Sequence, residues 1–378
     1  MKKIYDIVVI GAGLSSLMFL SRYILHNKKQ SILLIEKNNK KSINQTFCIW
    51  QGPGLIDIKK TYNLKSRHCW NKIEVSYGDE SICRDISPYS YECFDGKETL
   101  RNLLNQCKGK ITFKQGLDVK KINNNKESIE IITSKESICA KYVIDSRNKI
   151  TKKQYASPPS LRQAFIGNEI VSQNDKFNPE VLTLMEFSKN NKDIEFTYTL
   201  PFSKNHALVE TTLFSRSPSF NNIQRIHNQL LIKYNSFKSI REERGELPMT
   251  LAKDYANNNN LPIGLSAGMA RPSTGYSMMR IAQWVISIEN KKIKGNNISE
   301  FQFKPNRLLE WFDSIFLTVC YFWPHNAPIV FMRLFSNADV KSIIRFMSDV
   351  PTSRDIFSII LSMPKKIMIY GLIKKYVK

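Results

Sequence analysis

The chain has 378 residues, enough for two or three domains or for one large fold with insertions. Hydrophobic residues make up 42% and aromatic residues 11%, which excludes a globally disordered protein. The formal net charge of +23 favours an anionic partner, either nucleic acid or an acidic membrane surface. The charge alone does not distinguish these two partners. A codon bias toward lysine, asparagine and isoleucine is an equally good explanation for part of the positive charge.

The cysteines, histidines and apolar runs narrow the compartment and the chemistry. The seven cysteines form no CxxC pair, which predicts reduced cytosolic thiols, and the five histidines show no HxxxH spacing, so no metal site is expected. The apolar run Ile7–Ile10 is too short for a signal peptide. No stretch of about 18 apolar residues occurs, so no membrane-spanning helix is predicted.

The first residues carry the pattern of a dinucleotide-binding turn. Tyr5–Ile10 predicts a buried parallel strand, Leu17–His26 a helix, and Ser31–Ile35 a second strand that ends at Glu36. Between the first strand and the helix lies Gly11-Ala12-Gly13, a loop that would bring the pyrophosphate of a dinucleotide to the helix N-terminus.

Each residue of this loop has an expected role. Gly11 permits the tight turn, Gly13 allows the backbone to approach the phosphates, and Glu36 is placed to bond the ribose hydroxyls. Ser16 stands where a third glycine is usual, and a serine is small enough for close packing of helix on strand. The predicted contacts in this part of the chain are Gly11, Gly13, Leu14, Ser16, Glu36 and Lys37.

Residues 96–145 favour FAD over NAD. A helix is expected over Gly96–Cys107, a strand over Ile111–Phe113, a polar hairpin around Asn123–Asn125, and an apolar strand over Ala140–Asp145. Such a β-meander crossover is typical of FAD-binding proteins with two dinucleotide-binding folds. Asp145, which ends the last strand, is predicted to contact the cofactor.

The middle of the chain has a different pattern. Alternating apolar residues predict strands over Phe196–Leu200 and Ala207–Leu213, which indicates an antiparallel sheet inserted in the α/β domain. A helix is expected over Gln224–Lys238. The following run, Arg241–Pro248, is interpreted as a charged turn.

A second glycine-rich loop, Gly264–Gly268, precedes an apolar helix predicted over Met278–Ile288. A glycine turn that opens a helix offers free backbone N–H groups and the positive end of the helix dipole. We expect this loop to face the ribityl and pyrophosphate groups and the N1/O2 edge of a flavin. Its predicted contacts are Gly268, Pro272, Thr274, Gly275 and Tyr276.

Several segments, in this order, resemble the flavin-dependent lycopene cyclases of carotenoid-making bacteria and plants, most closely the bacterial lycopene β-cyclase type. They are Gly11–Leu14, Val143–Arg147, Gln163–Gly167, Tyr198–Pro201, Leu208–Thr212, Glu242–Pro248 and Pro272–Ser277. The resemblance extends from Tyr5 to about Pro364.

The resemblance implies an α/β chain with a Rossmann-like FAD-binding fold of the two-dinucleotide-binding type, an inserted antiparallel substrate sheet and a helical C-terminal region. The expected FAD-binding parts are residues 1–75, 96–157 and 246–295. Residues 76–95 would lie on the substrate side, residues 158–245 would form the substrate sheet, and residues 296–378 would be helical with possible membrane contact.

The resemblance also implies an activity, the conversion of linear lycopene through γ-carotene to β-carotene with reduced FAD and no net redox change. NAD(P)H would be the electron source, and linear carotenes the substrates. The expected proton donor is Glu210, which aligns with the first acid of the family's acidic pair and is flanked by apolar residues. Thr211 replaces the second acid, which weakens a mechanism with two carboxylates and leaves a single donor.

Other candidates are weaker. Glu246 lies where bacterial relatives often carry an apolar residue, and Gln45-Thr46-Phe47 replaces their usual His-Thr-Trp. Five aromatic residues could line a polyene site, with ordinary core packing an equal alternative for each: Tyr91, Phe165, Phe196, Tyr198 and Phe202.

The C-terminal segment Met363–Tyr376 is basic and is interpreted as an amphipathic helix suited to an anionic leaflet, with packing on the core as the alternative. Because lycopene is a hydrocarbon, we expect a peripheral protein on the cytoplasmic face of the cell membrane. Nucleic-acid binding is disfavoured, since no helix-turn-helix, zinc-finger or RNP motif occurs. A flavin monooxygenase, an isoprenoid reductase and a non-enzymatic flavin-binding scaffold remain alternatives.

Overall fold

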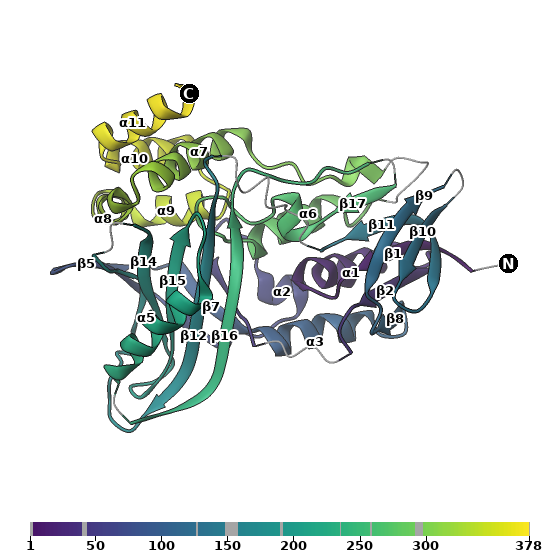
Figure 1. The fold of residues 1–378 in the computed structure, drawn as a ribbon, viewed down its shortest axis with the longest axis horizontal. Helices are drawn as coiled ribbons and strands as arrows, with labels where there is room; N and C mark the ends of the chain where they lie inside the picture. Colours follow the sequence, from purple (N-terminus) through teal and green to yellow (C-terminus); the bar gives the residue numbers. More distant parts are fainter. Residues whose placement is uncertain are drawn as a thin grey trace.

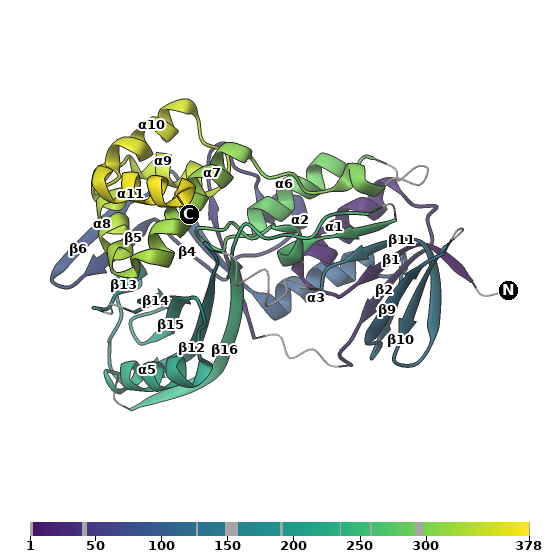
Figure 2. The same cartoon turned by 45° about the horizontal axis from the view of Figure 1, so that its top comes forward.

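The computed structural model describes residues 3–39, 44–125, 128–147, 158–189, 192–234, 236–257, 259–291 and 298–377. Its described part contains two large sheets, a small third sheet and a cluster of C-terminal helices (Figure 1). The first sheet and its helices lie at one end of the molecule, and the second sheet and the C-terminal helices lie at the other (Figures 1 and 2).

The first sheet has the order β8-β2-β1-β11-β10-β9, and β17 pairs with the second half of β11. The strands β8, β2, β1, β11 and β17 are parallel, whereas β9, β10 and β11 form the antiparallel meander that the sequence predicts. Their bounds are β1 Ile4–Ile10, β2 Ile32–Glu36, β8 Thr112–Gln115, β9 Val119–Asn124, β10 Ile129–Thr133, β11 Ser137–Asp145 and β17 Asn260–Pro262.

Both faces of the first sheet are covered, which explains the nearly continuous apolar run in β1. Val9 packs in the core formed with the helices, and Val8 packs in a second core with the meander. The helices on the first face are α1 (Leu14–His26), α2 (Ile58–Tyr62), α3 (Gly96–Cys107) and α6 (Met278–Ile288). The predicted bounds of α3 and α6 are confirmed, and α1 begins three residues before the predicted helix.

The second sheet has the order β16-β12-β15-β14-β13-β5-β6. Each neighbouring pair is antiparallel except β13 and β5, which run parallel. The bounds are β5 Lys72–Tyr77, β6 Glu80–Asp85, β12 Leu161–Ser172, β13 Val181–Phe187, β14 Ile194–Pro201, β15 His206–Ser215 and β16 Phe237–Met249. The helix α5 (Phe220–Ile232) packs on β12 and β15, on the face of the sheet that is turned away from the first sheet (Figure 1).

Two predictions for this region are wrong. Arg241–Pro248 is not a turn, because it lies within β16, which pairs with β12 over almost its whole length. The preceding helix ends at Ile232, and the chain from Phe237 onward already belongs to that strand. The burial along β16 explains the misinterpretation, since buried Glu243 alternates with exposed Glu242 and Arg244, a period of two that a charged run conceals.

A small antiparallel sheet lies between the large ones. Its order is β3-β7-β4, with bounds β3 Thr46–Gln51, β4 His68–Trp70 and β7 Ser90–Asp95. Residues 76–95 therefore contribute to two sheets, because β5 and β6 belong to the second sheet and β7 to the small one. The predicted domain limits at residues 157 and 295 lie outside the described residues.

The C-terminal region is helical, as predicted. Its helices are α7 Arg307–Phe322, α8 Ala327–Asn337, α9 Val340–Met347, α10 Ser353–Ser362 and α11 Lys365–Tyr376. Gly371 allows α11 to approach α7 closely, since a Cβ atom there would lie 2.6 Å from Val319 Cγ2. No single helix in the described ranges has the length and apolar character to cross a membrane, although α7 with the segment Pro324–Asn337, and α10 with α11, meet those criteria as strongly bent pairs.

Candidate active site

A cavity of about 450 Å³ lies where the first sheet, the second sheet and the C-terminal helices meet. Its wall includes the Gly13 loop before α1, the cavity-facing side chains of β12, β14, β15 and β16, and Phe331 and Met347 from α8 and α9. Apolar and aromatic side chains dominate among the lining residues, a composition typical of small-molecule sites.

The turn between β1 and α1 has the geometry that the motif predicts. Gly11 has φ +89°, and a Cβ atom there would lie 2.5 Å from Ser146 Oγ, so the position requires glycine. Gly13 is the N-cap of α1, and a Cβ atom on it would meet nothing within 4 Å. The N-terminus of α1 therefore opens on free space, where Gly13, Leu14 and Ser15 line the cavity.

The acidic residues at the ends of β2 and β11 lie behind this turn. Glu36 is buried, and its Oε2 accepts a hydrogen bond from the Ala12 backbone N–H at 2.8 Å, which fixes the loop to the strand end. Asp145 is fully buried and forms an ion pair with Arg147 at 2.7 Å. Lys37 is exposed and lies 3.6 Å from Asp118. Their contacts with a cofactor remain predictions.

The second glycine-rich loop approaches the first. Gly264 has φ +73°, and a Cβ atom on it would lie 2.8 Å from Ser15 Oγ. Thr274, Gly275 and Tyr276 line the cavity, as do the first residues of α6. Gly268, a predicted contact, caps a short helical turn, whereas Gly264 lines the cavity and is the residue at the point of close approach. Pro272 is buried next to the lining residues.

The residues present fit a bound FAD. At its N-terminus, where Gly13 is the N-cap, α1 has free backbone N–H groups. Such groups suit a pyrophosphate. Ser16 Oγ and Ser266 Oγ are buried and lack a hydrogen-bond partner among the described residues, as does Gln163 Oε1, which lines the cavity. These orphaned polar atoms lie on or near the two loops, where a polar cofactor would supply partners.

Glu210 lies on the opposite side of the cavity, in the middle of β15. Its side chain is only 8% exposed, and Oε1 accepts a hydrogen bond from Thr212 Oγ1 at 2.7 Å. Burial, and the nearby Glu243 carboxylate, raise the pKa of Glu210 to about 8. The carboxyl is therefore largely protonated at neutral pH, as a proton donor requires.

Thr211 points away from the cavity, because successive side chains of a strand lie on opposite faces. Its hydroxyl lies 3.0 Å from His227 Nδ1 of α5, and His227 Nε2 lies 2.9 Å from Asn168 Oδ1. An acid at position 211 would therefore also face α5. The replacement of the family's second acid by Thr211 leaves the cavity unchanged.

Tyrosines and a cysteine form the polar part of the aromatic wall. Tyr198 Oη lies 3.2 Å from Cys48 Sγ and 3.0 Å from Tyr91 Oη, and Tyr91 Oη lies 3.3 Å from Tyr276 Oη. Burial raises the pKa of each of these groups, so all remain neutral at pH 7. Phe165 and Phe196 also line the cavity, whereas Phe202 instead packs against Arg67, 4.1 Å from its guanidinium carbon.

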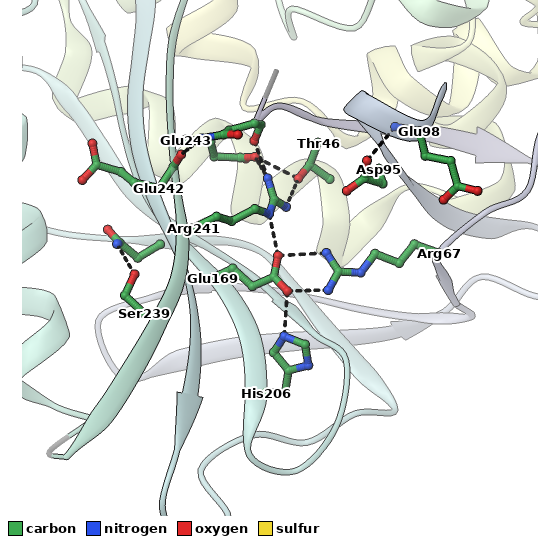
Figure 3. A network of polar contacts seen from close by, with 12 residues as sticks. Thr46, Arg67, Asp95, Glu98, Glu169, His206, Ser239, Arg241, Glu242 and Glu243 are labelled. Carbon is green, nitrogen blue, oxygen red and sulfur yellow. Dashed lines mark hydrogen bonds and ion pairs between the residues drawn. The ribbon is translucent and has the colours of Figure 1, made fainter. Parts of the chain in front are cut away.

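A charged network lies beside the cavity on the same face of the sheet (Figure 3). Glu169 accepts hydrogen bonds from Arg67 and Arg241, and His206 Nε2 lies 2.7 Å from its Oε1. Although burial opposes ionisation, these partners lower the pKa of Glu169 to about 2. Arg241 also donates to Glu243 Oε2 at 2.7 Å, which links the network to the cavity wall.

Glu243 is a functional candidate that the sequence pattern does not predict, because the charged run on β16 favours a turn. Glu243 is 4% exposed and lines the cavity, where Thr46 Oγ1 donates to its Oε2 at 2.9 Å. The segment Gln45-Thr46-Phe47, which departs from the bacterial pattern, also lines the cavity. Glu246 lies at the wall with Arg162 Nη1 at 3.3 Å.

The family model described as "Lycopene cyclase protein" matches residues 6–370. The chain belongs to this family. A lycopene β-cyclase of Paracoccus sp. is 30% identical over 130 residues, which cover 32% of this chain and 34% of the relative. The chloroplastic lycopene β-cyclase of Solanum lycopersicum is 24% identical and covers 73% of this chain, which spans 58% of that relative's length.

Solved structures show the same fold as this lycopene cyclase family member. A geranylgeranyl bacteriochlorophyll reductase-like protein of Thermoplasma acidophilum has a TM-score of 0.60 and 11% identity, and the match covers 100% of this chain and 97% of that one. A flavin-dependent brominase has a TM-score of 0.61 and 11% identity, with coverage of 99% and 100%. The Rossmann-like flavoprotein fold, the inserted sheet and the helical C-terminal region are thus confirmed.

Proposed function

We propose that this chain is a lycopene β-cyclase that uses reduced FAD and Glu210 to close β-rings on linear lycopene. The observation that carries the proposal is a buried carboxyl, Glu210, in a cavity of apolar and aromatic side chains that also opens on the dinucleotide loop. The family match and the names of the relatives support the substrate class.

The chemistry needs one proton donor and no net oxidation. Glu210 gives its proton to C2 of the terminal C1=C2 bond, which leaves a tertiary cation at C1. The C5=C6 electron pair then forms the C1–C6 bond, and loss of the C6 proton to a base leaves the C5=C6 bond of the β-ring. The Glu210 carboxylate lines the cavity that would hold the ring and can take back this proton, so the enzyme is regenerated.

The walls of the cavity protect the intermediate. Water would trap a carbocation as an alcohol, so the site has to be apolar and closed. Phe165, Phe196 and the Tyr91–Tyr198 pair supply aromatic faces, which stabilise nearby positive charge. Reduced FAD, when bound through the Gly13 and Gly264 loops, would add a negative charge near the reacting polyene end. NAD(P)H is the proposed source of its electrons.

The test is pigment analysis in cells that accumulate lycopene. Expression of the chain should convert lycopene to γ- and β-carotene, and Glu210→Gln should lower the rate about 10²–10⁴-fold. Retained FAD absorbance in the purified Glu210→Gln protein would show that the variant is folded. Unchanged lycopene with a folded, FAD-loaded wild-type protein would refute the proposal.

The similarity of fold to a reductase-like protein leaves a flavin monooxygenase or isoprenoid reductase as the second candidate. Such an enzyme would consume NADPH in proportion to product, and the monooxygenase would consume O₂ as well. A cyclase needs NADPH only to reduce the flavin. Substrate-dependent, stoichiometric NADPH oxidation would therefore favour the second candidate.

The proposal includes attachment to the cytoplasmic face of the cell membrane, since lycopene is stored in membranes. The helices α10 and α11, at the end of the molecule away from the first sheet (Figure 1), expose apolar side chains. These include Phe357, Ile360, Leu361, Ile369, Tyr370 and Ile373, with exposed Lys365, Lys366 and Lys374 among them. Apolar side chains with lysines suit an anionic bilayer surface.

Vesicle flotation tests this attachment. The protein should float with vesicles that contain phosphatidylglycerol and bind phosphatidylcholine vesicles less, since lysines contribute about 1 kcal/mol each at an anionic surface. Phe357→Ser with Ile373→Ser should reduce flotation without loss of FAD. Equal recovery of wild type and variant with vesicles would contradict the assignment of α10 and α11.

A further inference from the structure

Two buried glutamates from different strands lie on one face of the second sheet. Gly167 of β12 pairs with Glu210 of β15 on one side and with Glu243 of β16 on the other. A Cβ atom on Gly167 would lie 3.3 Å from Glu210 Cβ and 3.4 Å from Glu243 Cγ. The two glutamate side chains therefore flank the space above a residue that has no side chain of its own.

The two carboxyls have different partners. Glu243 Oε2 accepts hydrogen bonds from Thr46 Oγ1 at 2.9 Å and from the Arg241 guanidinium at 2.7 Å. Glu210 Oε1 accepts one hydrogen bond, from Thr212 at 2.7 Å. Since a neighbouring guanidinium stabilises a carboxylate, the negative charge of the pair belongs on Glu243 and the proton on Glu210.

Two other titratable groups near Glu210, Tyr198 and Cys48, are neutral. Tyr198 lies opposite Glu210 on β14, and Cys48 lies on β3 at the cavity wall. Burial raises the pKa of both, so neither carries charge at neutral pH. Burial also raises the pKa of Glu243, whereas Arg241 and Thr46 oppose that shift. On β16, the cation Arg241 lies beyond Glu243 and is shared with Glu169.

We propose that Glu243 is a positioning residue for the cyclisation: its carboxylate, held by Arg241 and Thr46 across Gly167, retains the proton on Glu210. This inference rests on the proposed function. Glu243 gives up no proton and forms no bond in the reaction. After Glu210 has protonated C2 of the polyene, both glutamates are carboxylates, and their two negative charges lie on the cavity wall that faces the cation. The repulsion between the two carboxylates favours return of the proton to Glu210.

This arrangement restores two carboxylates to the cavity wall. Thr211 could not supply the second, because it faces α5, whereas Glu243 reaches the site from a strand that lies 33 residues further along the chain. The pair forms only when β12 separates β15 from β16 and contributes a glycine at the crossing.

Direct titration of the Glu210 carboxyl tests the inference. In FAD-loaded protein labelled with ¹³C at glutamate carboxyls, the signal lost in Glu210→Gln identifies this group. Glu243→Gln should lower its titration midpoint by about one pH unit or more, since a like charge is removed. Glu243→Asp keeps the charge and should restore most of the shift.

Glu242→Gln is the matched control, because Glu242 is exposed and points away from Glu243 on the same strand (Figure 3). It should leave the Glu210 midpoint unchanged. An unchanged midpoint in folded Glu243→Gln would overturn the inference, as would a shift of equal size in Glu242→Gln.

The titration needs no substrate, so it separates this inference from the proposed activity. If lycopene is cyclised, the alkaline limb of the pH–rate profile should move to lower pH in Glu243→Gln and stay in place in Glu242→Gln. A loss of rate with no movement of that limb would indicate a structural role for Glu243 and would contradict the inference.

Discussion

The two faces of the second sheet differ in what they bury. The cavity face of β12, β15 and β16 carries Glu169, Glu210 and Glu243, together with Arg241. The face under α5 buries mainly apolar side chains, together with Thr211 and Asn168, whose polar groups contact His227 of α5. Neighbours along one strand thus have unrelated environments.

This difference shows how one strand can serve chemistry and stability at once. On the cavity face, ionisable side chains stay buried because hydrogen bonds and ion pairs stabilise them. Burial of a charge without such partners would cost several kcal/mol. Side chains on the α5 face contribute packing and satisfied hydrogen bonds. The comparison predicts different consequences for substitutions that are adjacent in sequence.

The largest effect is expected at Glu169 on the cavity face. Glu169→Gln removes the buried carboxylate shared by Arg67 and Arg241 and should lower the free energy of unfolding by roughly 3 kcal/mol, because charged hydrogen bonds from two partly exposed arginines are lost. Urea unfolding at pH 7 measures this. The exposed Glu242→Gln is the control and should change stability by less than about 0.5 kcal/mol.

The same carboxylate should make the fold sensitive to strong acid. The pKa of Glu169 is about 2 in the folded protein, below its ordinary value, so its contribution is complete above about pH 4.5 and is lost as the pH falls toward 2. Wild-type protein should therefore lose more stability than Glu169→Gln over this range.

The next effect is the pH dependence of stability, which differs in direction between the two faces. Burial lowers the pKa of His227 to about 4, so the folded state binds fewer protons than the unfolded state, and stability falls as the pH drops from about 6.5 to 4. The size is up to roughly 3 kcal/mol. The raised pKa of Glu210 acts in the opposite direction, since stability falls as the pH rises from about 4.5 to 8.

Variants separate the two contributions. His227→Gln should flatten the loss of stability on the acidic side, and Glu210→Gln should flatten the loss on the alkaline side. Denaturant unfolding between pH 4 and 8.5 measures both slopes. If either variant altered the slope on the other side instead, the assignment of these groups to separate faces would be wrong.

The smallest effect is expected at Thr211. Thr211→Val keeps the shape of the side chain and removes the hydroxyl that lies 3.0 Å from His227 Nδ1, at a cost of about 1 kcal/mol. The turnover of lycopene should not change, because the hydroxyl faces α5. Activity reduced as strongly as by Glu210→Gln would contradict the separation of the faces.

Local patterns predicted much of the fold and part of the site. The Gly11–Gly13 turn, the helices Gly96–Cys107 and Met278–Ile288, and the position of Glu210 in a strand follow from periodicity and glycine chemistry, which act over a few residues. Glu210 could be chosen because it aligns with the first acid of the acidic pair in the family that the chain resembles, and because apolar neighbours flank it in sequence.

Glu243 could not be found this way, since its environment depends on pairing between strands that are far apart in the chain. The signal that was available is the alternation along β16, where Arg241, Glu243 and Gly245 share one face. Even so, the placement of Glu243 and Glu210 on either side of Gly167 requires the order β16-β12-β15, which the hydrophobic pattern does not determine.

The pairing of β5 with β13, and of β17 with β11, has a consequence for synthesis on the ribosome. The first sheet is completed beside Val143–Asp145 only after residues 260–262 have been synthesised. Likewise, β5 can pair with β13 only after more than 100 further residues have been added. Exposed strand edges are therefore present during much of translation, when they can pair with other chains. Slow elongation or a nascent-chain chaperone should matter more for this protein than for one whose sheets are completed in sequence order.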